Sequence, residues 1–83
     1  MKYRIELLKK ARKFIKAQPP KQQERILNAI YKLPDGDVKA LSGKQNAYRL
    51  RVGDCRVIYQ MDNTVLIITV VDVGNRGQIY NRL

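Results

Sequence analysis

The sequence predicts a small α+β domain spanning residues 1–83, with its elements in the order strand-helix-helix-strand-strand-strand (β-α-α-β-β-β). Three observations support this prediction. Apolar residues recur at three- and four-residue spacing in the first third of the chain, as in amphipathic helices. Alternating or nearly continuous apolar runs fill the second half, as in strands. The length of 83 residues, with 45% hydrophobic and 29% charged residues, is typical of one globular domain.

The N-terminal part predicts one strand and a helical hairpin. Lys2–Leu7 alternates imperfectly between polar and apolar residues, which indicates a short strand added at a sheet edge. Leu7–Ala17 changes to the period of an amphipathic helix. Pro19-Pro20 ends this helix, because proline cannot continue the hydrogen-bond ladder. Pro20 also suits the first turn of a second helix, which is expected to run to Leu33.

The second half predicts an antiparallel meander, with the helical hairpin packed on one face of the sheet and the other face partly open. Val38–Ala47 lacks clear periodicity and is expected to be a loop after the turn at residues 34–37. The residues after Gly74 are expected to form a short C-terminal tail or helix. The strands are expected at Tyr48–Val52, Cys55–Met61 and Thr64–Val73, joined by two-residue turns at Gly53-Asp54 and Asp62-Asn63.

The turn at Gly53-Asp54 sets a register that gathers arginines on one face of the sheet. Arg51 then lies directly opposite Arg56, with Arg49 two residues along the same face. Like charges directly opposite each other are destabilising, so this placement suggests anion binding, because guanidinium groups match phosphate oxygens. The alternative is a solvated face whose arginine stems cover apolar neighbours. The opposite face is expected to form the core, with Tyr48, Leu50, Val52, Cys55, Val57 and Tyr59.

Charge and composition exclude several classes of protein. The chain has 17 Lys+Arg against 7 Asp+Glu, a formal net charge of +10, which is typical of a partner of polyanions. The absence of histidine excludes histidine-based acid–base catalysis and Ser-His or Cys-His dyads. A single cysteine excludes an internal disulfide and a cysteine-rich zinc site. No metal or other cofactor is expected.

The same sequence gives no sign of a membrane or secretory location. No apolar stretch approaches the ~20 residues that a membrane span needs. The first six residues carry a glutamate and lack the apolar region of a signal peptide. A cytoplasmic protein is therefore expected.

Several individual residues have an ordinary structural interpretation beside a functional one. Cys55 alternates with core residues and is expected to be an inert buried thiol, and Tyr59 to be a core aromatic. Tyr80 either faces a ligand or docks onto the fold. The lysine-rich first helix is either a solvated face or a binding surface. No carboxylates are paired for acid–base chemistry.

Three segments resemble the RelE/ParE superfamily of toxins from type II toxin–antitoxin modules. The run Tyr48–Tyr59 is similar to the signature of that superfamily. Val73–Tyr80 is similar to its C-terminal motif of Val-Gly, basic residues and a tyrosine, and Leu41-Ser42-Gly43 to its Leu-x-Gly before the hairpin. The resemblance covers almost the whole chain and implies one RelE/ParE-like toxin domain over residues 1–83.

The resemblance implies two different activities for the two branches. RelE-like members cut mRNA in the ribosomal A site, whereas ParE-like members poison DNA gyrase and are not nucleases. On the favoured RelE-like branch, the matching catalytic positions are Arg51, Arg56, Arg76 and Tyr80. The expected RNA-binding residues are Arg49, Lys9, Lys10, Lys13 and Lys44.

The chain also departs from the RelE pattern. Arginines stand at positions 49 and 51, where lysines are usual, and the Arg-x-Arg form also occurs on the ParE side. Asn75 and Gly77 stand where basic residues are common. A gyrase poison, or a non-toxic remnant that only binds its antitoxin, therefore stays an alternative to the nuclease.

A nuclease without histidine or metal would use the 2′-hydroxyl of its substrate as the nucleophile. The protein then has to orient that hydroxyl, neutralise the phosphate and assist the leaving oxygen. The implied partners are a cognate RelB-like antitoxin, the ribosome and mRNA, and operator DNA bound through the antitoxin. No membrane partner is expected.

Overall fold

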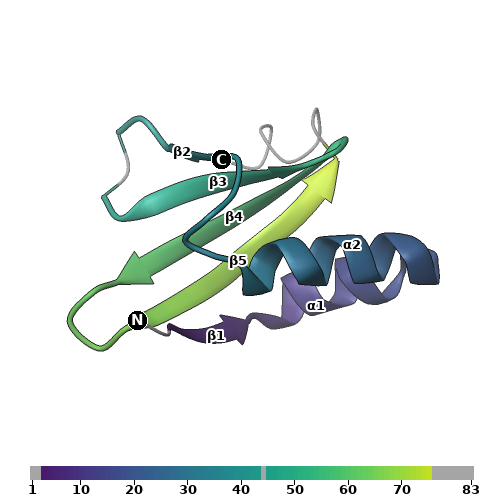
Figure 1. Ribbon diagram of the computed structural model, residues 1–83, viewed down its shortest axis with the longest axis horizontal. Coiled ribbons are helices and arrows are strands. Elements are labelled where there is room, and N and C mark those ends of the chain that lie inside the picture. Colours follow the sequence, from purple (N-terminus) through teal and green to yellow (C-terminus); the bar gives the residue numbers. More distant parts are fainter. Residues whose placement is uncertain (1–2, 44, 76–83) are drawn as a thin grey trace.

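The computed structural model describes residues 3–43 and 45–75 of the chain. Within these residues five strands form one mixed sheet, and two helices lie across one of its faces (Figure 1). The elements are β1 (Arg4–Leu7), α1 (Lys9–Lys16), α2 (Pro20–Tyr31), β2 (Val38–Ala40), β3 (Ala47–Val52), β4 (Cys55–Asp62) and β5 (Ile67–Asn75).

The strand order is β1-β5-β4-β3-β2, which confirms the α+β fold and the expected position of the first strand at an edge. Strands β2 to β5 form the antiparallel meander, but β1 runs parallel to β5. The sheet is therefore mixed and not purely antiparallel. The direction of an edge strand depends on the long-range path of the chain, which a local residue pattern does not contain.

Strand β2 corrects the expected loop over Val38–Ala47. Its three residues pair antiparallel with Tyr48–Leu50 of β3. Backbone hydrogen bonds extend the contact on both sides: Arg51 N–H donates to the Asp37 carbonyl at 2.9 Å, and Leu41 N–H to the Ala47 carbonyl at 2.9 Å. Three residues are too few to show a period of two, so the pairing is visible only in the folded chain.

The turn between β4 and β5 is longer than the two residues expected. The Asp62 carboxylate accepts hydrogen bonds from the backbone N–H groups of Thr64 (2.9 Å) and Val65 (3.4 Å). This local bonding keeps residues 63–66 in a turn, and Leu66 adopts a left-handed φ of 56°. Strand β5 therefore begins at Ile67 and not at Thr64.

The expected end of the last strand at Gly74 is also wrong. Gly74 lies within β5 opposite Arg56, and the strand continues to Asn75 opposite Cys55. A glycine in a strand weakens the pattern from which a strand is predicted, but pairing with β4 keeps this segment extended. The predicted tail or helix beyond Asn75 lies outside the described residues.

The core lies between the helices and the sheet, as the alternation in β3 and β4 predicts. Tyr48 packs against the cluster and stacks on Tyr59, with ring centroids 5.4 Å apart. The buried cluster consists of Ala11, Ile15, Ile26, Ile30, Leu33, Leu50, Val52, Cys55, Val57, Tyr59, Ile68, Val70 and Val73.

No described helix is long and apolar enough to cross a membrane.

Tyr59 is the largest fully buried side chain of the described core. Its side chain is fully buried, and its hydroxyl has no hydrogen-bond partner among the residues that the structure describes. Burial, with a smaller contribution from neighbouring Tyr48, raises the pKa of Tyr59 to about 12. The expectation that Tyr59 is a core aromatic is confirmed. Cys55 is likewise buried, and its Sγ accepts a hydrogen bond from Gln22 Nε2 at 3.4 Å.

Candidate nucleic-acid interface

The open face of the sheet, meaning the face turned away from α1 and α2, carries the arginines that the register predicts. The pairing places Arg51 directly opposite Arg56, and Val52 opposite Cys55, as the tight turn requires. Gly53 has φ +59°, the left-handed value that the expected type II′ turn needs at this position. The hairpin therefore brings two guanidinium-bearing residues side by side at one end of the open face.

Arg56 is held by the hairpin itself. Its side chain is buried, with the residue only 5% exposed, and Nη1 donates hydrogen bonds to the carbonyls of Gly53 and Cys55, both at 3.1 Å. These two carbonyl dipoles offset part of the repulsion from the neighbouring Arg51. The guanidinium of Arg56 is therefore fixed in place, whereas Arg51 is exposed.

Arg49 is a half-buried member of the same face. Its Nη1 lies 3.8 Å from Oδ1 of Asp37, and its backbone lies directly opposite Ile58, which is 3% exposed. The burial of Ile58 on this face fits the expectation that arginine stems cover it. The two interpretations of the arginines are therefore compatible: Arg49 stands beside a buried apolar residue, and Arg49, Arg51 and Arg56 gather positive charge on one face.

Arg25 of α2 is a neighbour of the hairpin that the sequence analysis missed. Its guanidinium lies 3.2 Å from the point where a Cβ on Gly53 would stand. A groove of about 390 Å³ lies beside it, between α2, the turn that follows α2 and the end of β3, and Lys32, Asp37 and Arg51 contribute to its lining. An arginine on the polar side of a helix gives no signal in the sequence that it approaches a turn 28 positions later.

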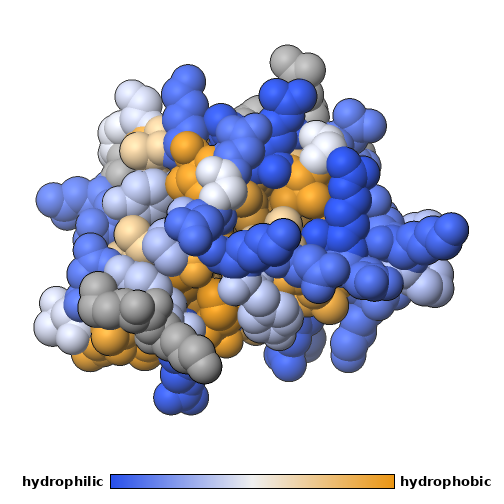
Figure 2. Space-filling model, viewed as in Figure 1, coloured by the Kyte–Doolittle hydropathy of each residue, from blue (hydrophilic) through white to orange (hydrophobic). Residues whose placement is uncertain are grey.

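The lysines of α1 form a separate surface on the other side of the sheet. Lys9 and Lys13 are exposed, but Nζ of Lys10 lies 3.5 Å from Oδ2 of the buried Asp72. Figure 2 shows hydrophilic side chains spread over the face seen in Figure 1, with apolar residues between them. The predicted RNA contacts of α1 therefore do not converge with the arginines of the open face, and Lys10 has a structural partner.

Asp72 was not singled out in the sequence, although it carried a signal. It is a carboxylate inside a nine-residue strand that is otherwise apolar or small, and such a residue is rarely buried without a partner.

Of the remaining predicted site residues, Lys44, Arg76 and Tyr80 lie outside the described residues. The described part of the site is thus Arg49, Arg51 and Arg56.

This arrangement is suited to holding a phosphate group. A fixed guanidinium beside an exposed one supplies charge and directed donors on a surface that a polymer can reach. Residues 3–43 and 45–75 contain no group of three or more His, Cys, Asp or Glu side chains that would hold a metal ion.

Comparisons with known proteins identify the family. Residues 5–80 match the family described as the ParE toxin of the type II toxin–antitoxin system parDE. A toxin candidate of Methanocaldococcus jannaschii, RelE1, is 31% identical over 77 residues, which cover 82% of this chain and 86% of the relative. The chain belongs to the RelE/ParE superfamily of type II toxins.

Solved structures of RelE toxins share the fold of this RelE/ParE-type toxin. The RelE chain of the archaeal RelE–RelB complex from Pyrococcus horikoshii is 30% identical, with a TM-score of 0.77 over 94% of this chain and 99% of that chain. Isolated RelE from E. coli is 20% identical, with a TM-score of 0.73 over 96% and 93% of the two chains. The chain is therefore a RelE-like toxin of a type II module.

Proposed function

We propose that this RelE-like toxin is a ribosome-dependent mRNA endonuclease that cuts in the A site and thereby inhibits translation. The observation that carries the proposal is the pair of Arg56 and Arg51 on the open face. Two backbone carbonyls fix the buried guanidinium of Arg56, and Arg51 stands directly opposite in the exposed position. A phosphate needs this combination of a preorganised donor and a second cation that solvent and substrate can reach.

The proposed reaction uses the RNA as its own nucleophile. The 2′-oxygen loses its proton and attacks the adjacent phosphorus, and the bond from phosphorus to the 5′-oxygen breaks. The products are a 2′,3′-cyclic phosphate and a 5′-hydroxyl, whose oxygen takes up a proton. Arg51 and Arg56 neutralise the charge that develops on the phosphate, and Arg49 holds the RNA beside them.

Arg76 and Tyr80 complete the proposed catalytic set. Arg76 stabilises the transition state or protonates the leaving oxygen, and Tyr80 acts as the base or stacks on a splayed nucleotide. Arginine stays protonated at ordinary pH, so none of the three arginines of the open face is suited to remove the proton. The reaction needs no metal or other cofactor.

The proposed partners follow from charge and from the relatives. The P. horikoshii RelE was solved in a complex with RelB. We propose that this toxin also binds a RelB-like antitoxin, and that the toxin–antitoxin complex binds operator DNA through the antitoxin. The net charge of +10 suits contact with the ribosome. Lys9 and Lys13 are exposed on α1 and are the proposed contacts to ribosomal RNA, and Lys44 is proposed to contact RNA as well.

Gyrase poisoning is the second candidate function. The matching family is described by its ParE toxin, and Arg49 and Arg51 have the Arg-x-Arg form. On this alternative the arginines contact a protein or DNA and no phosphodiester bond of RNA is broken. A third candidate is a remnant that binds antitoxin without toxicity.

Primer extension on a defined mRNA in purified programmed ribosomes separates these candidates. We expect cuts within the A-site codon from the wild type and a loss of roughly 10²–10³-fold in rate for Arg56→Ala, since one preorganised donor commonly contributes that much. Arg76→Ala is expected to have an effect of the same kind. Lys21→Ala, which removes an exposed cation from α2 away from the open face, is the control and should keep the wild-type rate.

The alternatives have their own outcomes. Intact mRNA with folded wild-type protein would contradict the nuclease, and a DNA supercoiling assay with purified gyrase would then follow. Inhibition in that assay would establish the ParE-like activity. If the wild type neither cuts mRNA nor inhibits gyrase but still binds antitoxin, the chain is the non-toxic remnant.

A further inference from the structure

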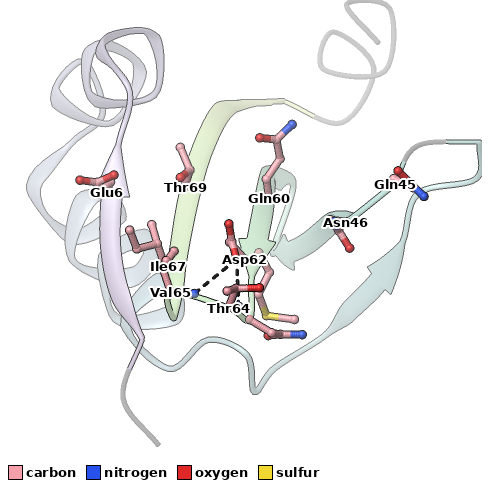
Figure 3. A pocket seen from close by; sticks show the side chains of 11 residues that line it. Glu6, Gln45, Asn46, Gln60, Asp62, Thr64, Val65, Ile67 and Thr69 are labelled. Atoms are coloured by element: carbon pink, nitrogen blue, oxygen red, sulfur yellow. Dashed lines mark hydrogen bonds between the residues drawn. The ribbon is translucent and has the colours of Figure 1, made fainter.

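The open face has a second feature at the end opposite to the arginine pair. An open cavity of about 730 Å³ lies there, between the β4–β5 turn and the loop that precedes β3. Figure 3 shows side chains from β1, β4 and β5 and from that loop around it. The volume lies within the range of ordinary small-ligand sites. Its polar lining includes four amides and two hydroxyls: Gln45, Asn46, Gln60, Asn63, Thr64 and Thr69.

Strand register places this cavity on the same face as the arginines. Arg56 and Gln60 are four residues apart on β4 and therefore point to the same side, about 13 Å apart at the rise of a strand. Thr69 lies opposite Gln60, and Glu6 lies opposite Thr69. A distance of about 13 Å spans no more than about four nucleotides at the stacked spacing of ~3.4 Å. One short single strand can thus contact both places.

The charge of the cavity differs from that of the arginine end. Among the described residues that line it there is no lysine or arginine, although the chain carries a net charge of +10. Its two carboxylates already have partners: Asp62 accepts two backbone N–H groups, and Glu6 lies 3.6 Å from the guanidinium of Arg4. The described lining therefore offers no cation to hold a phosphate, and its carboxylate oxygens are already engaged by other groups. A neutral polar group is the ligand that fits.

The walls of the cavity are tied to the sheet. Met61 N–H donates to the Asn46 carbonyl at 3.1 Å, which fixes the loop before β3 against β4. The hydroxyl of Tyr3 donates to Oδ1 of Asn63 at 2.6 Å, which fixes the β4–β5 turn against the start of β1. Half-buried Ile67 supplies apolar surface between the polar groups. A ligand with a flat ring can contact the apolar surface with its face and the polar groups with the atoms along its edge.

We propose that this cavity is a base-recognition subsite that takes an adenine of the RNA strand whose phosphate the arginines hold. Primary amides pair with adenine through one donated and one accepted hydrogen bond. Gln60 and Asn46 are two such amides beside the bond that ties the loop to β4, whereas the Asn63 oxygen already accepts the Tyr3 hydroxyl. The proposal rests on the proposed function, because it requires that RNA binds the open face. It makes the cavity a determinant of where along an mRNA the toxin binds.

The test measures binding of short RNA to the full-length protein by fluorescence anisotropy. The probes are labelled hexanucleotides with 2′-O-methyl riboses, which block cleavage through the 2′-oxygen. One probe contains only uridine, and each of six others contains a single adenosine at a different position. We expect the adenosine at one or two positions to tighten binding roughly tenfold over the all-uridine probe, the usual discrimination of one bidentate contact.

The variants assign this preference to the cavity. Gln60→Met keeps an unbranched side chain but removes the amide, and should abolish the tenfold difference while leaving the affinity for the all-uridine probe unchanged. Thr69→Val, which replaces a hydroxyl by a methyl group on the adjacent strand, should reduce the difference. Asn28→Met removes an exposed amide from α2, outside the cavity, and should retain the full preference.

The outcomes separate the two proposals. Equal affinity of the wild type for all probes, or a preference that survives Gln60→Met in a folded protein, overturns the subsite but leaves the nuclease intact. No binding of any probe, together with intact mRNA in programmed ribosomes, overturns both. Amide shifts of Gln60 in NMR spectra on addition of an arginine-containing peptide, with none on addition of RNA, would assign the cavity to a protein side chain and overturn the subsite.

Discussion

The two faces of strand β4 perform different tasks with alternating residues of one segment. On the helix-covered face Cys55, Val57 and Tyr59 are between 0% and 3% exposed and belong to the core. On the open face the strand carries the fixed Arg56 at 5% exposure, the buried Ile58 at 3% and the exposed Gln60. Burial of apolar surface stabilises the fold on the first face, whereas the second face keeps polar groups available to a ligand. Substitutions one residue apart should therefore affect stability or activity, but seldom both.

The sharpest test of this difference compares adjacent residues on β5. Ile68 is fully buried and Thr69 is half-buried on the open face. Ile68→Ala should lower the free energy of unfolding by about 2–5 kcal/mol, the loss typical of a buried large-to-small substitution. Thr69→Ala should lower it by less than about 1 kcal/mol. Urea unfolding followed by circular dichroism measures both, and equal losses would show that the two faces contribute alike.

Tyr59 offers a second test, because its buried hydroxyl gives the core a pH dependence. Its pKa is about 12 in the folded chain, against 10.0 for an unperturbed tyrosine. The unfolded chain therefore releases this proton first, so the stabilisation is complete below pH 10 and declines as pH rises toward 12. Between pH 10 and pH 12, ionisation of Tyr59 should lower the free energy of unfolding by about 2–3 kcal/mol.

The Tyr59→Phe variant isolates that contribution. Unfolding free energies at pH 9, 10, 11 and 12 should fall less steeply in the variant than in the wild type, because all other titrating groups are shared. At pH 7 the variant should be as stable as the wild type or slightly more stable, since it removes a buried hydroxyl that lacks a partner among the described residues. Parallel pH curves for the two proteins would mean that Tyr59 ionises normally.

The alternation that separates the two faces was readable in the sequence, because β3 and β4 meet at a short turn. Gly53 marked that turn, and counting outward from it placed Arg51 opposite Arg56 and Leu50 opposite Val57, as the structure confirms. The same counting failed at the next turn. The Asp62 carboxylate bonds to Thr64 and lengthens that turn, and a bulge between Ile58 and Tyr59 shifts the register with β5.

The electrostatic environment of the site was not readable in the same way. Asp37 reaches Arg49 only because β2 pairs with β3, and Arg25 reaches Gly53 only because α2 crosses the sheet. These contacts join segments whose distance in space depends on packing and not on local period. The sequence therefore predicts which residues share a face, but not which side chains hold them there.

Gly53 tests whether the hairpin geometry and the neighbouring arginine act together. Gly53→Ala should lower the free energy of unfolding by about 1–2 kcal/mol, because alanine is strained at φ +59° and its Cβ would press on Arg25. Gly43 is the matched control: it has φ +76° and nothing within 4 Å of a built Cβ, so Gly43→Ala carries the strain alone. In an Arg25→Ala background, Gly53→Ala and Gly43→Ala should lower the free energy of unfolding by the same amount. If Gly53→Ala still costs more in that background, Arg25 is not the cause of the difference.

The smallest expected change concerns the ion pair between Arg49 and Asp37, and it separates binding from stability most finely. The atoms are 3.8 Å apart and the Asp37 side chain is 61% exposed, so Asp37→Asn should change the free energy of unfolding by less than about 0.5 kcal/mol. It should leave mRNA cleavage at least as fast, because one negative charge beside the arginines is removed. Arg49→Gln should change stability by a similarly small amount, since glutamine keeps the first part of the Arg49 stem opposite Ile58, yet it should slow cleavage. If instead Asp37→Asn slowed cleavage as much as Arg49→Gln, the ion pair itself would orient Arg49, and the open face would depend on its acidic neighbours as much as on its arginines.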